Sequence, residues 1–121
     1  MVNEHMNRDI PVHLWVAALM RRAELSGAFA TIAHKGDAER GDVLVKVTTE
    51  RGRAQLYAPA PEPFGEPGDE GAFARYFPDA ETVEESEVDT VIARRLGYDR
   101  DLWVIEIEDR AGRSFLTERI R

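Results

Sequence analysis

The sequence contains no cysteine among its 121 residues. Disulfides, thiolate zinc sites, iron–sulfur ligation and cysteine nucleophiles are therefore all excluded. A chain of this length can bury about 65% of its unfolded surface, so it needs neither a disulfide nor a metal to hold a core. The absence of cysteine also fits a reducing compartment, where disulfides are rare.

Long apolar segments are missing as well. The longest uninterrupted run is Leu14–Met20, whereas a helix needs about 20 apolar residues to cross a membrane. The first nine residues are mostly polar and include two acids, which is unlike a signal or transit peptide. We therefore predict a cytoplasmic protein that does not enter a membrane.

Motifs for catalysis and cofactor binding are absent. The three histidines, His5, His13 and His34, have no partner histidine three or four residues away, so no two-histidine metal signature is present. The chain also lacks a Gly-X-Ser-X-Gly nucleophile motif and a glycine-rich phosphate loop. The sequence therefore predicts no metal and no cofactor, and it favours a protein that is not an enzyme.

Positive charge is scarce in the middle of the chain. The formal net charge is −7, and 15 of the 23 acidic residues lie between Glu62 and Asp109. Such a segment repels phosphate backbones, so nucleic-acid binding is the least favoured function. It would require four helical arginines to gather on one surface, namely Arg21, Arg22, Arg94 and Arg95.

Periodicity predicts two helices and several strands. The apolar residues from Val12 onward recur every three to four positions until Ser26 and Gly27, and residues 82–97 follow the same pattern. Alternation and turn signals predict strands at 28–34, 43–50, 54–60, 72–77, 102–109 and 114–120. The Leu-Trp-Val triplet occurs in the first helix and again in the strand at 102–109, so it is not a repeat. We expect an α+β fold with a mainly antiparallel sheet of four to six strands and both helices packed on one face.

The predicted domain organisation is simple. Residues 1–10 are expected to form a flexible tail, and residues 11–121 a single α+β domain. Residues 59–71 hold four of the six prolines and three glycines, so we predict an exposed loop there.

Two helices on one side would leave the other face of the sheet open. The apolar residues expected on that face are Leu44, Tyr57, Leu102 and Val104, with polar neighbours around them. Mixed patches of this kind occur at protein–protein interfaces. The sequence thus favours a small interaction or assembly module, either a homodimer or a protein bound to a different partner.

An alternative function uses the acidic strand at 101–109. Glu106 and Glu108 share one face of this strand, about 7 Å apart, and Asp101 lies just before it. Paired carboxylates can hold a metal or act as acid and base. With His34 assisting, these residues would make a small metal-dependent or acid/base hydrolase, which the sequence favours less than a module.

Two blocks of the chain resemble a known family. The motifs "GDA…G.VLVKV" and "D.DLWV.E.ED", within residues 14–58 and 84–116, are similar to those of short, mostly alphaproteobacterial proteins known as domain of unknown function 1491. The resemblance implies a stand-alone cytoplasmic bacterial protein. It implies no activity and no catalytic residue, and the segment 59–71 departs from the family pattern.

Overall fold

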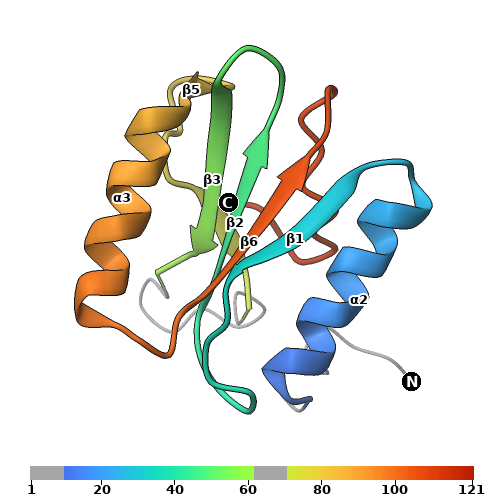
Figure 1. Ribbon diagram of the computed structural model, residues 1–121, viewed down its shortest axis with the longest axis vertical. Helices are drawn as coiled ribbons and strands as arrows, with labels where there is room; N and C mark the ends of the chain where they lie inside the picture. Colours follow the sequence, from blue (N-terminus) through green and yellow to red (C-terminus); the bar gives the residue numbers. More distant parts are fainter. Residues whose placement is uncertain (1–9, 62–70) are drawn as a thin grey trace.

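The computed structural model describes residues 10–61 and 71–121. The predicted tail at 1–10 falls almost wholly outside these ranges, as does most of the predicted loop at 59–71. The described residues form two helices and six strands, which confirms the α+β fold (Figure 1). In chain order they are α2 (Val12–Leu25), β1 (Phe29–His34), β2 (Val43–Thr48), β3 (Arg53–Pro59), β4 (Phe73–Arg75), β5 (Val83–Glu84), α3 (Glu85–Tyr98) and β6 (Trp103–Glu108).

The strands form one sheet in the order β1-β6-β2-β3-β4, and β5 also pairs with β3. All pairs are antiparallel except β2 with β6, which run parallel from Val43 beside Trp103 to Thr48 beside Glu108. The prediction of a mainly antiparallel sheet is therefore confirmed. Neither helix in the described ranges is long and apolar enough to span a bilayer.

The two helices cover opposite faces of the sheet, so the prediction that both pack on one face is wrong. One face, called here the α2 face, carries Val43, Val45 and Val47 packed against α2. The other, the α3 face, carries Leu44 and Val104 packed against α3. Figure 1 shows α2 beside β1 and α3 beside β3. The parallel β2–β6 pair needs a crossover connection, and α3 lies in that connection.

The predicted strand at 114–120 is also wrong. Phe115 has a φ of 62°, a left-handed conformation that interrupts an extended run. The segment instead lies over the α2 face, where Phe115 and Leu116 pack against the core. Only Ile120 pairs with a strand, through an isolated bridge to Phe73.

Candidate binding groove between α2 and β4

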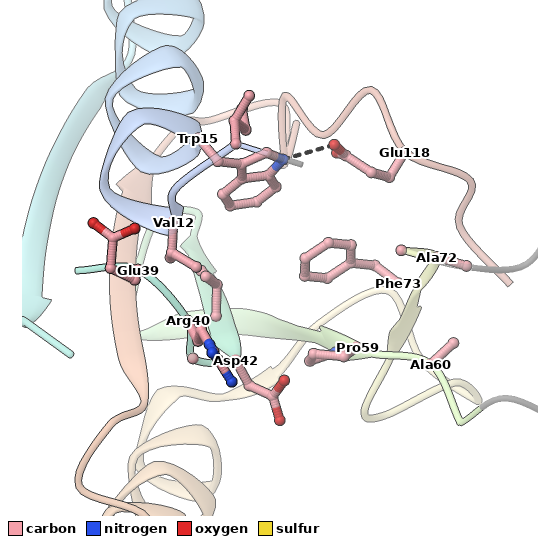
Figure 2. A pocket seen from close by; sticks show the side chains of 14 residues that line it. Val12, Trp15, Glu39, Arg40, Asp42, Pro59, Ala60, Ala72, Phe73 and Glu118 are labelled. Atoms are coloured by element: carbon pink, nitrogen blue, oxygen red, sulfur yellow. Dashed lines mark hydrogen bonds between the residues drawn. The ribbon is translucent and has the colours of Figure 1, made fainter. Parts of the chain in front are cut away.

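A groove of about 590 Å³ opens on the α2 face between α2 and β4 (Figure 2). Its most prominent side chains are Trp15 of α2 and Phe73 of β4, whose rings stack 5.7 Å apart at an interplanar angle of 9°. Val12, Val43 and Pro59 extend the apolar lining. Four elements that are distant in sequence thus form one surface.

The C-terminal segment contacts both residues of the aromatic stack. The Trp15 indole N–H donates to a carboxylate oxygen of Glu118 over 2.8 Å, as the dashed line in Figure 2 shows. The Phe73 backbone N–H donates to Arg119, and the Arg121 N–H donates to the Phe73 carbonyl. The C-terminal segment therefore holds the Trp15 ring directly and Phe73 through its backbone.

The loop between β1 and β2 forms the opposite wall. The Asp37 carboxylate accepts the backbone N–H groups of Glu39 and Arg40 over 3.1 and 2.7 Å, which folds the loop into a tight turn. Carbonyls of this loop accept the first helical N–H groups, from Val12 and His13. The loop therefore satisfies donors that a capping side chain would otherwise satisfy, and it fixes the groove's rim to α2.

Charged side chains line this rim. The acids are Glu39, Asp42 and Glu118, and Arg40 is the single base among the lining residues that the structure describes. A rim that is more acidic than basic favours a cationic ligand.

Lys46 is the most buried charged group of the α3 face. Its ammonium lies 2.6 Å from Glu85, 2.7 Å from Asp89 and 3.6 Å from Glu106. Burial alone would lower the pKa of Lys46, but hydrogen bonds to Asp89 and Glu85 and the charge of Glu106 raise it above its ordinary value. This cluster ties α3 to the sheet.

The residues predicted to form an open interface are buried. Leu44, Leu102 and Val104 lie under α3, and each is at most 2% exposed. Tyr57 is buried on the other face, in the core beneath α2. The predicted interface is therefore wrong, because the second helix covers the face that was expected to stay open.

The residues that the hydrolase hypothesis would place in one active site contact different neighbours. Glu106 lies beside Lys46, and a ring nitrogen of His34 is 2.8 Å from the Leu102 carbonyl oxygen. Asp101 and Glu108 flank opposite ends of β6, which at about 3.3 Å per residue places them roughly 20 Å apart. Within residues 10–61 and 71–121, no three histidine or acidic side chains come close enough to hold a metal ion.

The four helical arginines do not form one basic surface either. Arg21 and Arg22 belong to α2, whereas Arg94 and Arg95 belong to α3 on the opposite face. Arg22 also donates to the Phe115 carbonyl, which makes it part of the packing of the C-terminal segment.

The turn after β6 is held by a buried carboxylate, Asp109, which accepts two side-chain hydrogen bonds from Arg113 over 3.0 and 2.7 Å. These hydrogen bonds hold the pKa of Asp109 below its usual value. Asp109 therefore stabilises the fold above about pH 4, and this contribution is lost as the pH falls through its folded pKa.

Replacing Asp109 by asparagine is expected to lower the free energy of unfolding by about 1 kcal/mol at neutral pH. The deficit should shrink in acid below pH 4, where the wild type loses the same interaction. Urea unfolding at pH 7 and pH 3 measures this, with the exposed Asp79→Asn as the control. A deficit that is equal at both pH values would contradict the assignment.

The groove was not predicted from the sequence. Its residues come from five separate stretches of the chain, so no local motif marks it. Trp15 belongs to the buried core and also lines the groove.

The fold defines the class of protein as a small α+β domain in which one helix covers each face of a mainly antiparallel sheet. A family model described as "Protein of unknown function (DUF1491)" matches residues 10–117. The chain therefore belongs to the DUF1491 family, as the sequence motifs indicated.

Solved structures agree with this assignment. A crystal structure of a DUF1491 family protein from Caulobacter crescentus CB15 is 42% identical, with a TM-score of 0.77, covering 93% of this chain and 98% of that one. An NMR structure of a DUF1491 family protein from the same organism is 43% identical, with a TM-score of 0.77 and coverage of 93% and 96%. A solution structure of a protein from A. tumefaciens is 32% identical, with a TM-score of 0.74 and the same coverage. No curated protein matches this chain.

Proposed function

We propose that this protein is a non-catalytic, cytoplasmic binding module whose groove between α2 and β4 docks a segment of a protein partner. The observation that carries the proposal is the anchored stack of Trp15 on Phe73 in the wall of that groove. Tryptophan and other aromatic residues concentrate at the energetic centres of interfaces, where they are surrounded by polar rims. The groove has both features.

The charges of the rim define the partner further. Glu39 and Asp42 of the β1–β2 loop, against the single Arg40 in a chain of net charge −7, favour a segment that carries basic residues. The apolar lining favours one aromatic or aliphatic side chain inserted between Val12 and Phe73. We therefore infer a docking segment with an apolar anchor flanked by lysine or arginine.

A panel of short peptides tests this directly. Peptides with a central leucine or phenylalanine flanked by arginine should shift the indole N–H resonance of Trp15, which Trp15→Phe assigns because the chain has only two tryptophans. Peptides flanked by glutamate should not. Equal shifts from both sets, or none from either, would refute the proposal.

Reversing one rim charge provides the matched variant. Asp42→Lys should weaken binding of the basic peptide about threefold to tenfold, since each exposed charge contributes up to about 1 kcal/mol. Glu108→Lys makes the same charge change at the exposed end of β6, outside the groove, and should leave the affinity within about twofold. Isothermal titration calorimetry measures both.

A second candidate function is self-association through β1. This strand lies at the edge of the sheet, and its apolar residues Phe29 and Ile32 are 73% and 45% exposed. Open edges pair readily with further strands. Sedimentation equilibrium should then show a dimer that Ile32→Lys dissociates, whereas Leu14→Lys, at an exposed position of α2, does not. A monomeric wild type would remove this candidate.

A further inference from the structure

A second hollow on the α2 face is lined by arginines. It has a volume of about 370 Å³ and lies at the end of the sheet formed by the β2–β3 hairpin, the turn after β6 and β4. The four arginines that line it are Arg51, Arg53, Arg75 and Arg110. None of the sequence patterns connects them, and the fold brings them together in a protein whose net charge is −7.

Arg75 is the central residue of this arginine cleft. It pairs with Tyr57 across β3 and β4, which sets its side chain on the α2 face beside a buried tyrosine. It is half-buried, yet among the described residues its guanidinium makes neither a hydrogen bond nor an ion pair. A partly desolvated cation without a counterion is costly unless an anion joins it.

The remaining arginines differ in how firmly they are held. Arg53 donates to the side chain and the carbonyl of Thr82 over 3.3 and 2.8 Å, so it is fixed at the rim. Arg110 is 89% exposed and lies 3.8 Å from Glu50, a contact that contributes little in water. Arg51 occupies a left-handed turn position with a φ of 63°. Arg51, Arg75 and Arg110 are therefore available to a ligand.

We propose that the arginine cleft binds the phosphate group of a small phosphate monoester. Four arginines and the two acids that also line the cleft, Glu50 and Glu81, leave a charge of +2, which matches the charge of about −1.5 to −2 of such a group at neutral pH. The Thr82 hydroxyl accepts from Arg53 and can donate its own proton at the same site. Arginine binds phosphate through two parallel hydrogen bonds.

A phosphate group fits the cleft better than the alternatives. A carboxylate has only two acceptor oxygens and one negative charge. The arginines of the cleft could bind more oxygens and balance more negative charge than that. A nucleic acid would need an extended basic stripe, whereas the cleft is confined between two turns and β4, and the acidic remainder of the chain repels a polyanion. The size and charge therefore favour a small molecule.

The test uses the full-length protein and glycerol 3-phosphate as the probe, with glycerol, sulfate and inorganic phosphate as comparisons. Titration followed by amide NMR should shift resonances around Gly52, Thr82 and Gly112. Glycerol 3-phosphate should bind more tightly than sulfate, and glycerol should not bind. Equal affinity for sulfate, phosphate and the monoester would overturn the proposal, as would the absence of shifts in this cleft.

Two variants make the test specific. Arg75→Gln should weaken binding of glycerol 3-phosphate about tenfold, and Arg110→Gln, at an exposed position that folding does not need, about threefold. Arg100→Gln removes an exposed arginine outside the cleft and should leave the affinity unchanged. Equal affinities in Arg110→Gln, Arg100→Gln and the wild type would overturn the proposal even if Arg75→Gln fails to fold. Binding of a phosphopeptide or an oligonucleotide without binding of the monoester would overturn it as well.

Discussion

Gly36→Ala is expected to destabilise the fold by about 3 kcal/mol, the upper range for overpacking a well-packed site. A Cβ at this position would lie 2.7 Å from Cδ1 of Trp103 and would overlap the carbonyl of Asp101. Neither neighbour can move easily, because the Trp103 indole donates to the Asp37 carbonyl over 2.7 Å and the Asp37 N–H donates to Asp101 over 3.1 Å. Urea unfolding followed by circular dichroism measures the loss.

The chain offers a matched control in Gly97→Ala. Gly97 lies within α3, and a Cβ there would meet no atom within 4 Å. Alanine should therefore leave the stability unchanged or raise it by up to about 1 kcal/mol, the difference in helix propensity. If both variants had the same stability, the close approach of the loop to Asp101 would not constrain the fold.

Peptide binding in the groove should also weaken in Gly36→Ala but not in Gly97→Ala, since the loop that contains Gly36 forms a groove wall.

Lys46→Met is expected to lower the free energy of unfolding by about 2–3 kcal/mol at neutral pH. Removing one member of a buried ion pair typically costs about 3–5 kcal/mol, and the cost is smaller here because Asp89 is 56% and Glu85 35% exposed. The variant leaves three carboxylates facing one another without a cation. Their repulsion should be relieved by protonation, so the deficit should shrink in acid.

Lys35→Met is the control for charge, because the exposed Lys35 is the only other lysine. It should change stability by no more than about 0.5 kcal/mol.

Alkaline unfolding gives a separate check of the role of Lys46. The pKa of Lys46 is raised in the fold, so its contribution is complete below pH 10.5 and is lost as the pH rises through the folded value. The stability of Lys46→Met should not show this fall at alkaline pH. If the wild type and Lys46→Met lost stability in parallel as the pH rises, the role of Lys46 would be contradicted.

The proposed groove and the arginine cleft share one short strand. Phe73 and Arg75 point to the same side of β4, two residues apart, and one lines each site. The C-terminal segment crosses the same face and holds Phe73 through backbone hydrogen bonds. The two binding experiments are nevertheless independent, because no residue lines both hollows.

Most secondary-structure elements could be predicted from the sequence because local periodicity determines them. The 3.6-residue pattern from Val12 to Leu25 and the alternation from Val43 to Thr48 each match an element of the structure. The segment 114–120, which was also predicted to be a strand, is not one, since Phe115 turns the chain and Leu116 packs on the core. A pattern of apolar residues indicates that a segment is buried, but it does not identify the element against which the segment packs.

The sequence by itself determined the family, the α+β class and the lack of cysteine chemistry, because these depend on composition, local motifs and residue spacing. Only the tertiary structure decided that α3 crosses to the face opposite α2 and covers Leu44 and Val104. It also decided that Trp15 stacks on Phe73 and that Arg75 lines the same hollow as Arg51 and Arg110. These arrangements join residues far apart in the chain, and their geometry follows from strand order and helix placement, which no local pattern encodes.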